Sequence, residues 1–322
     1  MYTLAHLSDP HLGPLPDPTV RELVSKRVLG YINWQSNRAA SFTSEHLDGI
    51  VADLTARAPD HIAITGDLVN IAIEAELDPA RRWLDGLGDP RDISLVLGNH
   101  DAYVPGALRK ACDAWAPYLT GDHALHPGPF PYLRQRDDIA IIGVSSAVAT
   151  GPFMATGHVG SGQAKRLTDM LARAGRDNAF RVVMIHHPPI RGATHWHKRL
   201  IGASRVRAAI REAGAELVLH GHTHVDSLNW IPGPDGPVPV VGVPSASHAP
   251  GTFHPGARYN LFTIERASGS AGTHGKWRCH MLERGFTAPG QGISDIREKT
   301  LSPEGPTKEH APRHSLAQPS GL

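Results

Sequence analysis

The sequence has few of the features that mark secreted or membrane-spanning proteins. Its only two cysteines, Cys112 and Cys279, are far apart and lie in no paired motif, which argues against a disulfide framework and a cysteine zinc site. No apolar run approaches the length needed to cross a bilayer, and the first residues lack a basic start followed by an apolar core. We therefore expect a soluble protein in the reducing cytoplasm.

Charge of one sign is also nearly absent. The 322 residues include 32 Lys and Arg against 31 Asp and Glu, which gives a formal net charge of +1 at pH 7. Such a chain has no global field that would collect nucleic acid, so no nucleic-acid partner is expected. Any anionic partner must be held locally.

Histidine, by contrast, is abundant. The chain has 21 histidines, and several stand beside Asp, Asn or Gly, where a core residue would not be expected. This composition is a reason to search for a metal site.

Short β-rich runs recur along the chain, and each ends in a small polar cluster: YTLAHLSDPH, HIAITGDLV, ISLVLGNHD, IAIIGVSS, RVVMIHHPP and ELVLHGHTH. Stretches with helical spacing lie between several of them, including residues 43–57 and 161–174. This alternation predicts an α/β core. The strand pairs after residue 223 predict a second, mostly antiparallel sheet. We predict one domain over residues 1–286 and a flexible, Pro/Gly/charge-rich tail over residues 287–322.

The polar clusters at the strand ends offer only oxygen and imidazole ligands, from Asp9, His11, Asp67, Asn99, His100, His186, His222 and His224. In open α/β sheets ligands collect beyond the carboxyl ends of the strands, so clusters distant in sequence can share one site. The two-residue spacing within DPH and HTH predicts paired side chains on one side of an extended segment. A glycine precedes three of the clusters and allows a sharp turn or close approach: Gly66, Gly98 and Gly221.

Five of these motifs, DPH, GDLV, GNHD, HHPP and GHTH, occur in an order that resembles the calcineurin-like metallophosphoesterase superfamily. The resemblance spans residues 3–224 and implies a four-layer α/β/β/α sandwich of two mixed β-sheets flanked by helices. It also implies two metal ions, one held by Asp9, His11, Asp67 and His224 and the other by Asp67, Asn99, His186 and His222. His186 is preferred to His187 because the family uses the first histidine of this run.

The implied chemistry is hydrolysis of a phosphate ester by a hydroxide that the two ions share. Asp67 would bridge the ions, and the ligand types suit Mn, Fe, Zn or Co without separating them. His100 resembles the family residue that stabilises phosphate charge or protonates the leaving group, so His100 and Asp67 are the predicted catalytic residues. Asp101 either orients a neighbour or caps a helix.

Each of these residues has an ordinary structural explanation when it is taken alone. Asp9 could cap a turn, and His186 could be a satisfied core histidine. All of these separate explanations would have to be correct together for the chain to lack a metal site. They therefore explain the whole group of residues poorly. For His195 and His197, in RGATHWHKR, a solvated loop is the better account, and contact with substrate stays open.

Residues 20–42 form a basic segment with apolar residues at roughly helical spacing, namely Val24, Val28, Tyr31, Ile32 and Trp34. This pattern is typical of a helix that packs on the core, and it also suits weak contact with a membrane surface or a lipid substrate. Loops over residues 12–42, 102–107, 150–160 and 190–200 are expected to decide substrate choice.

The superfamily acts on many phosphate esters, so fold and metals leave the substrate undetermined. The motif variants and short gaps most resemble bacterial class III cyclic-nucleotide and glycerophosphodiester phosphodiesterases, which predicts a small phosphodiester such as cyclic AMP. Alternatives are the UDP-diacylglucosamine pyrophosphatase of lipid A synthesis, a broad-specificity phosphomonoesterase, and a metal-binding scaffold without turnover. The lipid A branch generally carries Arg where His100 stands. Relatives often form dimers, so a homodimer is possible.

Overall fold

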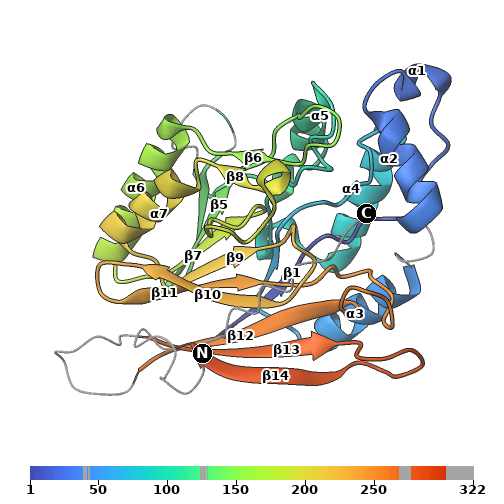
Figure 1. Cartoon of the computed structure of the whole chain (residues 1–322). Helices are drawn as coiled ribbons and strands as arrows, with labels where there is room; N and C mark the ends of the chain where they lie inside the picture. The colour runs from blue at the N-terminus through green and yellow to red at the C-terminus, as the bar shows by residue number, and fades with distance from the viewer. Residues whose placement is uncertain (39–41, 43, 124–127, 129, 268–276, 302–322) are drawn as a thin grey trace.

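The computed structural model describes residues 1–38, 42, 44–123, 128, 130–267 and 277–301. Two six-stranded sheets dominate it (Figure 1). In the first sheet the order is β14-β13-β12-β1-β2-β3, with bounds Ser294–Leu301, Trp277–Gly285, Arg258–Arg266, Tyr2–Leu7, His61–Ile64 and Ile93–Leu95. In the second it is β10-β11-β9-β7-β5-β4, with bounds Ser227–Pro232, Pro237–Gly242, Leu217–His220, Phe180–Ile185, Ile139–Val144 and Tyr132–Arg136.

Both sheets are mixed: the parallel strands form one half of the first sheet and the centre of the second. Strands β1, β2 and β3 run parallel, and β12 joins β1 antiparallel with Tyr2 opposite Ile264. In the second sheet β5, β7, β9 and β11 run parallel, and β4 and β10 are antiparallel at the two edges. The parallel strands are buried along their length, as expected of strands covered on both faces.

Helices cover the outer face of each sheet. Those on the first sheet are α3 (Ser44–Ala56), α4 (Glu74–Leu87) and α5 (Ala107–Ala114), and those on the second are α6 (Ser161–Arg176) and α7 (Ala203–Ala213). A separate apolar core lies between the sheets, where Leu4 and Phe262 of the first meet Val182 and Leu219 of the second. The predicted four-layer α/β/β/α sandwich is therefore confirmed.

Two sequence-based expectations need correction. The strands after residue 223 do not form a sheet of their own: β10 and β11 extend the second sheet, and β12 to β14 extend the first. Nor does the fold stop at residue 286, because β14 pairs with β13 from Ser294 to Leu301. The strand was missed because polar and charged residues dominate this edge strand, so it shows no apolar run. The rest of the predicted tail, residues 302–322, and the predicted helix start at Thr43 lie outside the described residues.

The segment after β1 forms α1 (Val20–Leu23), α2 (Arg27–Asn33) and a π-helical turn (Trp34–Arg38). We call residues 20–36 the lid segment. The predicted apolar residues of this segment lie in two environments. Tyr31 and Trp34 pack against the apolar core between the first sheet and its helices, whereas Val24 and Ile32 are exposed. None of the helices in the described ranges is long and apolar enough to cross a membrane.

Candidate metal centre

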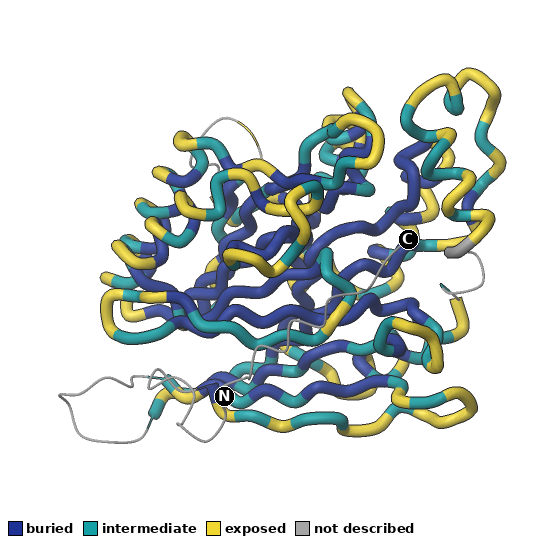
Figure 2. Tube along the Cα trace, viewed as in Figure 1, coloured by how far each residue is buried: buried dark blue, intermediate teal, exposed yellow. Residues whose placement is uncertain are grey.

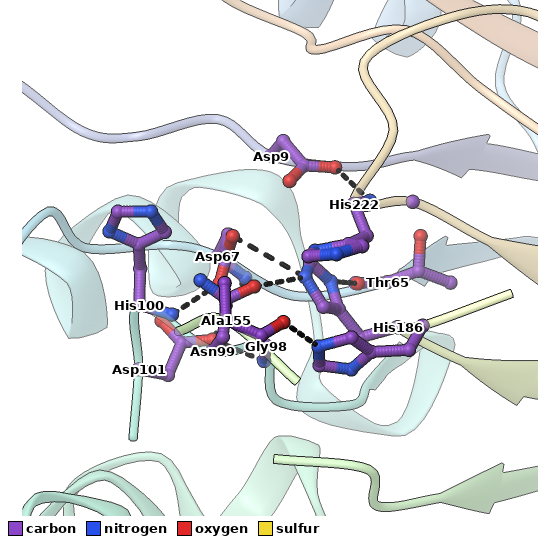
Figure 3. Close-up of polar contacts among 12 residues, drawn as sticks. Asp9, Thr65, Asp67, Gly98, Asn99, His100, Asp101, Ala155, His186 and His222 are labelled. Atoms are coloured by element: carbon purple, nitrogen blue, oxygen red, sulfur yellow. Dashed lines mark hydrogen bonds and ion pairs between the residues drawn. The ribbon is translucent and has the colours of Figure 1, made fainter. Parts of the chain in front are cut away.

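The predicted ligands lie on loops that follow the parallel strands. Asp9 and His11 follow β1, Asp67 follows β2, and Asn99 follows β3. In the second sheet His186 follows β7, and His222 and His224 follow β9. The sheets pack with these ends at one common edge, where all seven side chains gather. Figure 3 shows Asp9, Asp67, Asn99, His186 and His222 among them.

The backbone conformation that brings the paired ligands together differs from the predicted one. Asp9, His11, His222 and His224 all have left-handed backbones, with φ of 52°, 42°, 67° and 55°, so neither pair lies on an extended segment. Asp67 is also left-handed, with φ of 57°. Each such non-glycine residue costs about 1 kcal/mol or more, and it persists because the surrounding structure holds it in place.

Main-chain hydrogen bonds between the first two loops hold these turns. The backbone N–H of Asp9 donates to Gly66 O at 2.9 Å, and the N–H of His11 donates to Asp67 O at 3.1 Å. Across the sheets, the N–H of His222 donates to the Asp9 carboxylate at 3.0 Å (Figure 3). The strained loops therefore support one another, a relation that no single motif reveals.

The side chains form two adjoining groups. In one, Asp9 Oδ1 lies 3.1 Å from His224 Nε2 and 4.0 Å from His11 Nε2. In the other, His186 Nε2 lies 3.3 Å from both Asp67 Oδ2 and Asn99 Oδ1. Asp67 belongs to both sides, because it is grouped with His11 and His100 and also with Asp9 and His186, each set with donor atoms within 4.8 Å of one another.

Backbone carbonyls fix the orientation of three of these imidazoles. His11 Nδ1 bonds Val69 O at 3.3 Å, His186 Nδ1 bonds Thr65 O at 2.6 Å, and His222 Nε2 bonds Lys198 O at 2.9 Å. A carbonyl only accepts, so each of these nitrogens carries the proton and the opposite ring nitrogen keeps its lone pair. This arrangement is typical of metal-ligating histidines.

Electrostatics at the site favour a cation. Burial opposes the charge on Asp9, yet the neighbouring His224 and His186 outweigh it and lower the pKa of Asp9 to about 2. Burial likewise opposes a charge on His186, but the Asp67 carboxylate raises the pKa of His186 to about 9. The site thus stabilises positive charge beside its two carboxylates. Burial keeps the pKa of His222 well below its usual range, as a neutral imidazole ligand requires. Donor types and charge both fit divalent metal ions.

His187 is close enough to His186 and His222 to complete a three-histidine group. However, its Nδ1 pairs with Ser146 Oγ at 2.8 Å and its Nε2 donates to Ala155 O at 3.1 Å. Both ring nitrogens are engaged, which favours His186 as the ligand. His187 instead supports the loop that carries Ala155.

His100 lies beside His11 and Asp67, with donor atoms within 4.8 Å of one another. Its ring Nδ1 bonds Asn70 O, and its backbone N–H donates to Asp67 Oδ1 at 2.7 Å. The ring stacks on Tyr103, with centroids 5.5 Å apart, and the ammonium of Lys26 lies 4.5 Å from the Tyr103 ring centroid. Tyr103 and Lys26 carry no motif, so sequence reasoning gave no signal for them.

The contacts of Asp101 distinguish its two predicted roles, orienting a neighbour and capping a helix. Its carboxylate does not cap a helix. It accepts backbone N–H groups from Asp67, Leu68 and Gly98 at 2.8 to 2.9 Å, with a longer bond from Val69 at 3.3 Å. Burial and the nearby Asp67 carboxylate raise the pKa of Asp101 to about 7, against the effect of these donors. Asp101 therefore ties the Asp67 loop to the Gly98 loop from beneath.

Of the other predicted histidines, His195 and His197 lie at the turn Trp196–Lys198 and stack on each other with centroids 5.7 Å apart. Their side chains belong to none of the possible metal-binding groups among the described residues. Their loop does reach the centre through its backbone, because Lys198 O accepts from His222. A role in substrate contact stays a prediction.

Gly98 has the role expected of a glycine beside a metal centre. A Cβ there would lie 2.1 Å from Asp67 Oδ1 and 2.7 Å from His186 Cε1, closer than real atoms approach. Gly66 has φ of +96°, and a Cβ on it would lie 2.5 Å from Gly98 N. The two glycines thus let the second and third loops touch.

We expect Gly98→Ala to weaken metal binding about 10- to 100-fold, because the added methyl group displaces two candidate ligands. Calorimetric titration with Mn²⁺ measures the change. Gly86→Ala is the matched control, since a Cβ at Gly86 meets no atom within 4 Å. Equal Mn²⁺ affinity in the two variants would show that the close contact at Gly98 does not matter.

Comparison with known proteins agrees with this geometry. The family model described as calcineurin-like phosphoesterase matches residues 2–226. A probable cyclic nucleotide phosphodiesterase from Synechococcus is 24% identical over 234 residues, which cover 69% of this chain and 73% of that protein.

Two solved structures share the fold. A dimetal phosphatase from Danio rerio aligns with a TM-score of 0.57 and 10% identity, over 94% of this chain and 99% of that one. Purple acid phosphatase from yellow lupin aligns with a TM-score of 0.56 and 12% identity, over 98% of this chain and 57% of that one. At such low identities these two likenesses concern the fold alone.

Proposed function

The chain belongs to the calcineurin-like phosphoesterase family, and from this membership we propose that it hydrolyses a small phosphodiester with the help of two divalent metal ions. The observation that carries the proposal is the gathering of two buried carboxylates, four imidazoles and one amide at a single sheet edge. Their geometry supports two ions that share Asp67.

We assign Asp9, His11, Asp67 and His224 to one ion and Asp67, Asn99, His186 and His222 to the other. When bound, such ions supply Lewis-acid stabilisation of phosphoryl oxygens and activate water near neutral pH. The protein contributes the orientation of each ligand through the carbonyls of Val69, Thr65 and Lys198. The ligand types do not distinguish Mn, Fe, Zn and Co.

His100 is proposed to serve the leaving group. Its Nδ1–H donates to Asn70 O, so in the imidazolium form Nε2 carries the second N–H, which can give a proton to an ester oxygen or donate to a phosphoryl oxygen. The Tyr103 ring on one face and the edge-on His11 ring, at 4.8 Å, limit rotation of the imidazole. These rings hold the imidazole beside the Asp67 carboxylate, since His11, Asp67 and His100 have donor atoms within 4.8 Å of one another.

A diester is preferred as the substrate because the family match is joined by the resemblance to a probable cyclic nucleotide phosphodiesterase. We expect Mn²⁺-loaded protein to hydrolyse cyclic AMP and bis-p-nitrophenyl phosphate faster than p-nitrophenyl phosphate. Release of nucleotide or p-nitrophenolate measures the rates, and UDP-diacylglucosamine is the fourth substrate.

Each other outcome points to a different enzyme. Turnover of UDP-diacylglucosamine alone would replace the proposal with a lipid pyrophosphatase, and turnover of the monoester alone would replace it with a phosphomonoesterase. No turnover of any ester by protein with both ions bound would indicate a metal-holding scaffold.

A cytoplasmic location is part of the proposal. It is supported by the cysteines, since Cys112 and Cys279 are both free in the structure and Cys279 is buried. A chain that works among thiol reductants needs no disulfide.

A further inference from the structure

The exposed apolar side chains of this protein are not scattered. Apart from Met1, every exposed large hydrophobic side chain in the described ranges lies in the lid segment, on a loop at the candidate metal centre, or directly after such a loop. Apart from Met1, the most exposed are Phe253, Val20, Phe153, Val24 and Trp196, with exposed fractions of 98%, 82%, 82%, 81% and 68%. We call Val24, Ile32, Phe153, Trp196 and Phe253 the apolar rim.

Contacts between these segments place the rim around the centre. Lys26 of the lid segment donates to Thr150 Oγ1 and to Met154 O, both at 2.8 Å, which joins the lid to the loop of Phe153. The N–H of Ala155 donates to His197 O at 2.8 Å, which joins that loop to the turn of Trp196.

Two further contacts reach the ligands themselves. Lys198 O accepts from the His222 ring at 2.9 Å, and the ring of His254, next to Phe253, lies 6.1 Å from that of His224. The segments that carry the apolar rim therefore contact one another or lie next to the candidate ligands. In Figure 2 the lid segment is a mixture of exposed and intermediate tube, in contrast to the buried strands of the sheets.

The same segments concentrate positive charge. Residues 20–36, 150–156, 190–199 and 249–256 hold six Lys and Arg and a single acidic residue, Glu22, although the whole chain has a net charge of only +1. Glu22 is occupied in the capping box of α1, where it accepts from Thr19. Arg191 and Arg199 flank the exposed Trp196 and are themselves exposed.

We propose that the apolar rim is a docking surface for an anionic lipid bilayer, with the candidate metal centre turned toward the headgroups. Isolated Phe, Trp and Val side chains on separate loop tips, interleaved with Arg and Lys, match the boundary between acyl chains and charged headgroups. A protein partner would more readily fit a continuous apolar patch than single side chains on separate loops. The proposal concerns docking, so it stands or falls independently of the substrate.

The test is co-sedimentation of the full-length chain with vesicles at about 0.15 M salt. We expect binding to vesicles of phosphatidylcholine with phosphatidylglycerol and at least about tenfold weaker binding to phosphatidylcholine alone. The triple variant Phe153→Ser, Trp196→Ser, Phe253→Ser should lose at least about tenfold in partitioning. Arg191→Glu with Arg199→Glu should do the same, whereas the control pair Arg173→Glu with Arg211→Glu, on the outer helices α6 and α7, should bind normally.

A second measurement places a rim residue in the bilayer. Anionic vesicles should shift tryptophan emission to shorter wavelength in the parent protein, and Trp196→Phe should remove the shift while vesicle binding persists. Absence of vesicle binding would overturn the proposal and turn attention to a protein partner. Binding that survives the triple variant would overturn it too, since contact would then be purely electrostatic or lie elsewhere.

Discussion

Replacement of Asp67 by alanine is expected to lower phosphodiester hydrolysis by about 10⁴-fold or more, the scale seen when a central catalytic group is removed. Asp67 belongs to two of the possible metal-binding groups, as Asp9 also does, and we propose that Asp67 is the ligand shared by the two ions. Its loss should therefore disturb both ions, and metal analysis should find less than the two ions per chain expected of the parent protein. Hydrolysis of bis-p-nitrophenyl phosphate gives the rate.

The matched control for this variant is Asp78→Ala, which removes an exposed carboxylate on α4. It should retain full activity and both ions. If Asp67→Ala kept a rate within tenfold of the control, Asp67 would not be a shared ligand and the two-ion assignment would fail.

His100→Ala is expected to lower turnover by about 10²- to 10⁴-fold while both ions stay bound, because the role we propose for the side chain is proton transfer and not ligation. The loss should depend on the leaving group. An ester with an alcohol leaving group needs a proton, so it should suffer the larger loss, whereas p-nitrophenolate departs without one and should suffer the smaller loss.

Rates on both kinds of ester, together with metal content, test this role. His123→Ala, which removes an exposed histidine, is the control. An equal loss for both leaving groups would replace proton donation by charge stabilisation, and an unaltered rate would remove His100 from the mechanism.

The α/β class and the candidate site residues could be predicted from patterns that are local, whereas the four-layer order was implied by the resemblance to the family. Buried parallel strands appear as short apolar runs, and the polar residue after each run marks where the strand ends. The family motifs then indicate which of these residues serve together. The edge strand β14 was not predicted because an exposed edge strand is largely polar, so its sequence resembles that of a tail.

The backbone of the site could not be predicted in the same way. The left-handed conformations of Asp9 and Asp67 depend on hydrogen bonds to another loop, and residue type alone gives no sign of them. Asp101 was identified as a neighbour of the site, but its bonds to the Asp67 and Gly98 loops depend on tertiary structure. Lys26 reaches Tyr103, which stacks on His100, only because the lid segment folds back over the third loop.

The most direct test of the central claim is a crystal structure of the Mn²⁺-loaded protein with anomalous diffraction data. We expect two anomalous peaks about 3.5 to 4 Å apart, one on each side of the Asp67 carboxylate. One should be bound by Asp9, His11 and His224, and the other by Asn99, His186 and His222. A single peak, or two peaks that do not share Asp67, would contradict the proposed two-metal centre.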